Sequence, residues 1–157
     1  MSDACLICER IQMIKEGTNP YFVRELESGY VVLGDFQFYE GYTLLLSKKH
    51  VSELHEMPAT FKNRFLEEMS LVAEAVYNAF KPVKLNYELL GNLVSHCHWH
   101  IFPRYANDFQ PKKPIWVIDE TIRRAEHTRP SPEKLDALKK SLERELEKAI
   151  TKEKTVA

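Results

Sequence analysis

Residues 95–102 read Ser-His-Cys-His-Trp-His-Ile-Phe, which places His96, His98 and His100 at every second position. Alternate positions of a β-strand point to the same side of a sheet, so we expect the three imidazoles to share one face. The chain holds only six histidines, and half of them lie within these five positions. Burying three imidazoles requires three sets of polar partners, which argues against chance placement in a core. The segment therefore predicts a functional site built on a strand.

Around this segment, runs of β-branched, aromatic and other apolar residues predict five strands. The first two are joined by a short glycine-containing link that is typical of a hairpin, and the third is continuously apolar, which indicates burial on both faces. The five runs lie at residues 21–26, 30–33 and 42–47, and near 84–90 and 94–102. Together with the helices, this order predicts an α+β fold with a mainly antiparallel sheet.

Two segments carry the period of an amphipathic helix. The central one spans 58–80 and is stopped by Pro82, and the C-terminal one starts at Ser131-Pro132, where the serine can cap the helix. We expect residues 1–110 to form the main domain. Residues 111–157 are expected to form a proline-bounded linker and an amphipathic helix, which packs either on its own domain or on a partner subunit.

Composition narrows the class of protein. The 157 residues carry a formal net charge of −1, which excludes a generally basic nucleic-acid coat protein. No apolar run approaches the roughly 20 residues of a membrane helix, and Met1–Cys5 lacks the basic start of a secretion signal. We therefore expect a cytoplasmic protein with neither a nucleic-acid nor a membrane partner.

Three cysteines are too few for a disulfide scaffold, and their odd number argues against complete pairing. Two of them are spaced as Cys5-Leu6-Ile7-Cys8. In a reducing compartment this spacing indicates a metal site or a redox dithiol.

Two kinds of chemistry suit three histidines on one face. Neutral imidazoles bind metals, so His96, His98 and His100 are candidate ligands of an open catalytic metal in a metal-dependent hydrolase or a cupin-like enzyme. Alternatively, one ring nitrogen attacks phosphorus and forms a covalent intermediate, while the opposite nitrogen keeps its proton and donates it to an acceptor.

The segment 96–102 also resembles the motif of the histidine-triad (HIT) nucleotide hydrolases and transferases, His-φ-His-φ-His-φ-φ with φ apolar. Other stretches are similar to the family in the same order: Gly34-Asp35, residues 41–50, residues 90–95 and Pro103-Arg104-Tyr105. The resemblance covers residues 5–105 and implies a HIT-like fold and a homodimer. The chain departs from many members at Gly41-Tyr42, where they have Gly-His, and in its shorter loop before the triad.

The resemblance implies a role for each matching residue. His98 takes the place of the nucleophile that accepts a nucleoside monophosphoryl group, and His100 that of its phosphate-binding partner. Asp35 falls where family members contact the ribose, and Asn92 and Ser95 lie where they touch phosphates and the leaving group. The implied reaction consumes dinucleoside polyphosphates or nucleoside phosphoramidates through a nucleotidyl-histidine intermediate. A nucleotide-binding protein with little turnover remains an alternative.

Some HIT proteins also bind a structural zinc, and the resemblance carries that ligand set onto Cys5, Cys8, His50 and His96. Two thiolates and two imidazoles fill a tetrahedral zinc and leave no open position, which is typical of a structural site. We expect no catalytic organic cofactor.

Overall fold

The structure is a computed structural model that describes residues 5–156, apart from the side chain of Val156. Residues 1–4, which belong to the segment expected to lack a secretion signal, lie outside the described residues, as does residue 157. Among the helices of the described part, none is both long and apolar enough to cross a membrane.

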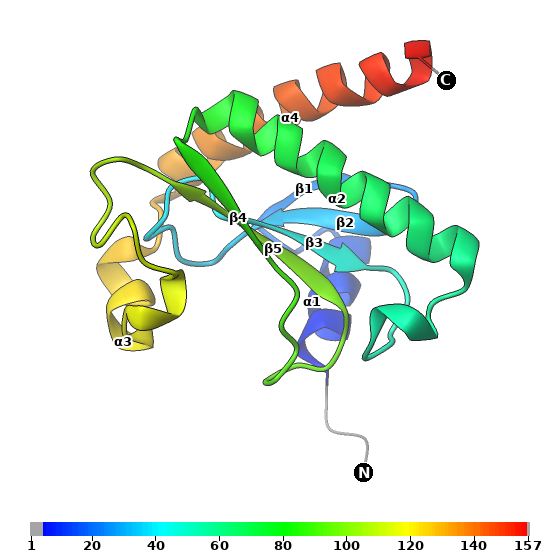
Figure 1. Cartoon of the computed structure of the whole chain (residues 1–157), viewed down its shortest axis with the longest axis horizontal. Helices are drawn as coiled ribbons and strands as arrows, with labels where there is room; N and C mark the ends of the chain where they lie inside the picture. The colour runs from blue at the N-terminus through cyan, green and yellow to red at the C-terminus, as the bar shows by residue number, and fades with distance from the viewer. Residues whose placement is uncertain (1–4, 157) are drawn as a thin grey trace.

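Five antiparallel strands form one sheet in the order β1-β2-β3-β5-β4 (Figure 1). Their bounds are Phe22–Glu25 for β1, Gly29–Leu33 for β2, Thr43–Ser47 for β3, Lys84–Glu88 for β4 and His98–Arg104 for β5. The α+β fold and the mainly antiparallel sheet are thereby confirmed. β5 lies between β3 and β4, which places the histidine segment inside the sheet.

The last strand is shifted from its predicted position near 94–102. It begins only at His98, and the backbone of Cys97 bonds to the end of β3 and the loop that follows it, accepting from Ser47 and donating to Val51. It continues to Arg104, although the loop was expected to begin at residue 103. Pro103 is tolerated because β3 pairs with β5 only as far as Ile101, which leaves one side of the strand free beyond that point.

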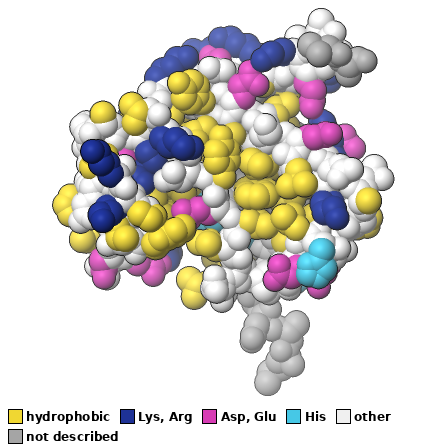
Figure 2. Space-filling model, in the orientation of Figure 1, with side chains coloured by type: hydrophobic (Ala, Val, Ile, Leu, Met, Phe, Trp, Pro, Cys, Tyr) yellow, Lys and Arg dark blue, Asp and Glu magenta, His cyan; other side chains and the backbone are white. Residues whose placement is uncertain are grey.

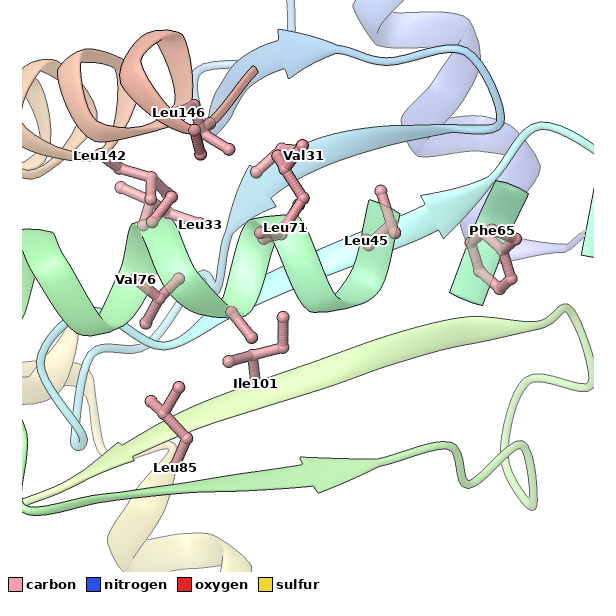
Figure 3. Packing of buried hydrophobic residues seen from close by; sticks show 14 of the residues in the cluster. Val31, Leu33, Leu45, Phe65, Leu71, Val76, Leu85, Ile101, Leu142 and Leu146 are labelled. Atoms are coloured by element: carbon pink, nitrogen blue, oxygen red, sulfur yellow. The ribbon is translucent and has the colours of Figure 1, made fainter. Parts of the chain in front are cut away.

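Both predicted helices are present, as α2 (Ala59–Phe80) and α4 (Pro132–Val156). They pack on each other and on one face of the sheet, as Figures 1 and 3 show. The apolar stripe of α4 is buried in the core of its own chain, with Leu142 fully inaccessible to solvent. Ser131 accepts a hydrogen bond from the backbone of Lys134, which confirms the expected cap.

Several short elements were not predicted from the sequence. The main one is α1 (Leu6–Lys15), which covers the opposite face of the sheet and buries only Ile7 and Ile11, too few positions for a clear helical period. The others follow β3 or β5: the 3-10 turns η1 (Leu54–Glu56), η2 (Ile115–Val117) and η3 (Glu126–Thr128), and the one-turn helix α3 (Glu120–Arg123). The face carrying α1 is also the face that carries the candidate site.

Candidate functional site

His98 and His100 lie on β5 and face the α1 side of the sheet, opposite Leu46 and Leu44 of β3. The residues that alternate with the histidines pack into the core beneath α2; they are Cys97, Trp99 and Ile101. The predicted alternation is therefore confirmed within the strand. His96 precedes β5, and its side chain turns toward the two N-terminal cysteines.

The protonation of His98 follows from its hydrogen bond. Its Nδ1 lies 2.6 Å from the backbone carbonyl oxygen of His96. A carbonyl only accepts, so Nδ1 carries the proton and Nε2 presents a lone pair. Burial lowers the pKa of His98, although the bond to His96 opposes this shift. The ring is thus held neutral, in the tautomer that a nucleophile requires.

His100 is held by Tyr42. The tyrosine hydroxyl lies 2.6 Å from Nδ1 of His100, and its ring stacks on Phe102 with 4.1 Å between centroids. Gly34 permits this position, since a Cβ there would collide with the Tyr42 ring. Burial lowers the pKa of His100 to about 3, with a further contribution from His98, and burial also raises the pKa of Tyr42. Both groups are therefore uncharged.

A cavity of about 480 Å³ opens over these histidines. Asp35 and Asn92 line it together with His98 and His100, so the fold gathers four of the five residues expected to act on the nucleotide. The fifth, Ser95, is exposed and is not part of the lining. Its role remains a prediction.

Asp35 accepts a hydrogen bond of 2.5 Å from the guanidinium of Arg10, which α1 places at the same cavity. The pair joins α1 to the loop that follows β2. Because α1 itself was not predicted, no pattern in the sequence pointed to Arg10.

The four residues of the expected zinc set form one cluster. Cys5, Cys8, His50 and His96 each offer a ligand atom, and these atoms all lie within 4.8 Å of one another. Nε2 of His96 donates to the carbonyl of Ser47 at 2.8 Å, which leaves Nδ1 free toward the thiols at 3.5 and 3.6 Å. Tetrahedral zinc separates sulfur and nitrogen ligands by about 3.5 Å. The donor set and its spacing fit that ion.

Further residues of the cavity were missed or left ambiguous by the sequence. Trp116 lines it and is 60% exposed, while Arg123 and Arg124 reach it from α3 and its C-terminal end. Glu88 is the least obvious, because no motif marked it within the predicted strand near 84–90. Its pairing with His100 would have been visible only from the register of β4 and β5.

The fold and the site define an α+β protein with a pair of neutral histidines at the floor of a cavity, beside a cluster of metal donors. The model of the HIT domain family matches residues 18–107, more than half of the chain, and the chain belongs to this family.

Two curated relatives show how far the sequence likeness extends. The HIT protein of Bacillus subtilis is 31% identical over 75 residues, which cover 45% of this chain and 52% of the relative. The adenosine 5'-monophosphoramidase of Saccharomyces cerevisiae is 24% identical over 102 residues, which cover 64% and 63%. The chain spans about half the length of the Bacillus relative and under two thirds of the yeast enzyme.

Solved structures agree on the fold. A histidine-triad nucleotide-binding protein from Sulfolobus tokodaii superposes with a TM-score of 0.70 at 23% identity, covering 90% of this chain and 93% of the other. A zinc-bound histidine-triad protein from Mycobacterium smegmatis gives 0.66 at 20% identity, covering 94% and 96%.

Proposed function

We propose that the chain is a nucleotide hydrolase or nucleotidyl transferase that passes a nucleoside monophosphoryl group through His98. The observation that carries this proposal is the hydrogen bond from Nδ1 of His98 to the carbonyl of His96, which leaves Nε2 as a lone-pair nitrogen at a cavity large enough for a nucleotide. Membership of the HIT family and the phosphoramidase activity named for the yeast relative support it.

In the first step, Nε2 of His98 attacks the α-phosphorus, and the bond to the leaving group breaks as the new N–P bond forms. The carbonyl of His96 stabilises the positive charge that develops on the ring. With the Tyr42 hydroxyl donating to Nδ1, His100 presents Nε2–H to a phosphate oxygen. Water then attacks phosphorus, releases the nucleoside monophosphate and regenerates His98.

The nucleoside lies on the β2–β3 side of the triad in this proposal. Asp35, braced by Arg10, accepts from the ribose hydroxyls, and the apolar side chains of β2 and β3 face the base. Asn92 contacts phosphate from the loop before β5, and Ser95 is assigned to the leaving group as the family resemblance implies.

The zinc proposed for this chain is structural. Cys5, Cys8, His50 and His96 would hold it, and it would supply a crosslink between the start of α1 and the segment leading into β5. The zinc-bound relative from Mycobacterium smegmatis supports this assignment. No step of the reaction uses the metal, and no organic cofactor is invoked.

A homodimer in the cytoplasm is the proposed assembly, with no nucleic acid or membrane as partner. β4 is an edge strand, and apolar side chains are exposed on it, just before it and on α2: Tyr87, Val83 and Tyr77. Figure 2 shows hydrophobic side chains gathered over the middle of this face. Light scattering should give twice the mass of one chain, and Tyr87→Glu should weaken the dimer. Residues 111–157 remain proposed as an appendage to a domain of residues 1–110.

The catalytic-metal alternative finds less support in the geometry. Among residues 5–156, His96 is the only histidine of the triad that belongs to the cluster of potential metal donors. His98 and His100 each use Nδ1 for another hydrogen bond. Binding of nucleotides with little turnover remains the second candidate, and a product assay separates it from the hydrolase.

The test is a product screen over dinucleoside polyphosphates, nucleoside phosphoramidates and nucleotidyl sugars, with His98→Ala and the exposed His127→Ala as a matched pair. His98→Ala should abolish turnover and His127→Ala should preserve it. A reaction quenched in base should show phosphate linked to His98. Near-normal turnover by folded His98→Ala would disprove the mechanism.

A further inference from the structure

Glu88 carries a buried carboxyl group that the described residues leave without an ion-pair partner. Glu88 ends β4 and pairs directly with His100, so the two side chains point to the same face and line the same cavity. The residue is only 7% exposed, and its Oε2 is buried with no hydrogen-bond partner. Buried polar atoms of this kind are rare in folded proteins and often mark a catalytic group.

The charged groups around Glu88 do not neutralise it. Arg104 is bound to Asp108, Asn86 and the carbonyl of Lys113. Arg123 donates from Nε to the carbonyl of Ile118 and forms no ion pair with Glu88 in the described structure. His100, Tyr42 and Tyr39 are further titratable neighbours of Glu88.

Burial has a defined effect on this carboxyl group. It raises the pKa of Glu88, against smaller opposing contributions from Arg123 and Arg104. Glu88 therefore keeps its proton at a higher pH than an ordinary glutamate does. A protonated carboxyl is a hydrogen-bond donor and a proton source inside the cavity.

The proposed reaction needs a proton when the leaving atom is nitrogen, because an amide anion is a very poor leaving group. His100 is a weak candidate for this task, since burial lowers its pKa to about 3 and leaves it without an extra proton. Glu88 is its direct neighbour across the strand pair. Space is also available on that side, because a second cavity of about 500 Å³ shares Glu88 and Trp116 with the first.

We propose that Glu88 is the general acid that protonates the leaving nitrogen when a nucleoside phosphoramidate reacts at His98. The inference rests on the proposed chemistry at His98. It adds a catalytic residue that supplies the proton of the leaving group.

The atoms balance over two steps. The lone pair on Nε2 of His98 forms a bond to phosphorus, the P–N bond breaks, and the carboxyl proton of Glu88 moves to the departing nitrogen. A neutral amine leaves, and Glu88 becomes a carboxylate. Water then attacks phosphorus, its proton returns to Glu88, and the electron pair of the N–P bond returns to His98.

The experiment compares Glu88→Gln with the full-length wild-type chain on two substrates. One is adenosine 5'-phosphoramidate, and the other is the p-nitrophenyl ester of AMP, whose phenolate departs without a proton. A positioned general acid contributes about 10²–10⁴-fold, so single-turnover formation of the His98 adduct from the phosphoramidate should fall at least about 100-fold, while adduct formation from the ester changes by less than about threefold. Glu74→Gln, on the exposed side of α2 beside Lys152, is the control.

The pH profile gives a second readout. Wild-type turnover of the phosphoramidate should decline as Glu88 loses its proton at rising pH, and this decline should be absent with the ester. Equal losses on both substrates in Glu88→Gln, or no loss on either, would overturn the role of Glu88. If wild type forms no His98 adduct with either substrate, the proposed function itself fails.

A wild-type measurement covers the case in which Glu88→Gln does not fold. Rates over a series of phosphoramidates with amines of increasing basicity should depend only weakly on the amine, because the acid offsets poor departure. A steep decline with increasing basicity would contradict proton donation by Glu88.

Discussion

Tyr42→Phe isolates the hydroxyl that holds His100. The replacement keeps the ring that stacks on Phe102 at 4.1 Å and removes only the oxygen 2.6 Å from Nδ1. A buried acceptor left without its donor costs about 1–3 kcal/mol. We expect the free energy of unfolding to fall by that amount.

The same substitution should slow the chemical step. Without Tyr42, the proton of His100 is no longer fixed on Nε2, where the phosphate oxygen is proposed to lie. If about 1.4 kcal/mol of this loss is expressed in the transition state, the rate falls about tenfold. Single-turnover formation of the His98 adduct, with Michaelis constants measured in parallel, reports this effect directly.

Tyr39→Phe supplies the matched control. Tyr39 also contacts the Phe102 ring and is only 3% exposed, but its hydroxyl has no hydrogen-bond partner in the described structure. Its removal should leave stability unchanged or raised, and should leave the chemical step intact. If the two variants behave alike in both assays, the assigned tautomer of His100 is wrong.

Three further outcomes follow from the same structure. Removing metal with a chelator, or the substitution Cys5→Ser, should lower stability and should raise the Michaelis constant more than it lowers kcat, because α1 carries Arg10 to Asp35. Elemental analysis should find about one zinc per chain, and a metal-free protein of full stability would exclude the site. Leu142→Ala should cost about 2–5 kcal/mol of unfolding free energy in urea melts, since the side chain is completely buried, and a loss below 1 kcal/mol would contradict the packing of α4. Below pH 6.5 the unfolded chain binds a proton at His100, whereas the folded chain, in which the pKa of His100 is about 3, does not. The free energy of unfolding should therefore decrease as the pH is lowered, by at most about 1.4 kcal/mol per pH unit. Melts at pH 7 and 5 should show a smaller decrease for His100→Gln than for wild type, and equal decreases would refute this expectation.

Periodic patterns made most of the fold predictable. The spacing of apolar residues located α2 and α4, and the alternation around residues 98–101 assigned each side chain to its face of the sheet. α1 was not predicted, because a surface helix with only two buried residues shows almost no periodicity of apolar residues. The histidines of the site lie at alternate positions of one short segment, so the sequence alone was enough to predict them.

The residues that complete the cavity are distant from the triad in sequence. Arg10 depends on the unpredicted α1, and Glu88 meets His100 only through the register of two strands. Tyr42 was noted as a departure from the family, but its bond to His100 is a property of the folded chain. Such partners follow from three-dimensional packing, which no local pattern encodes.

His96 belongs to two sites at once. Its imidazole lies among the metal donors, while its main-chain oxygen orients the ring of His98. Occupancy of one site therefore bears on the other through a single residue, and thermodynamic linkage makes any such coupling reciprocal. If a metal ion that fixes His96 raises the affinity of the cavity for a nucleotide, a bound nucleotide raises the affinity of the cluster for the metal by the same factor.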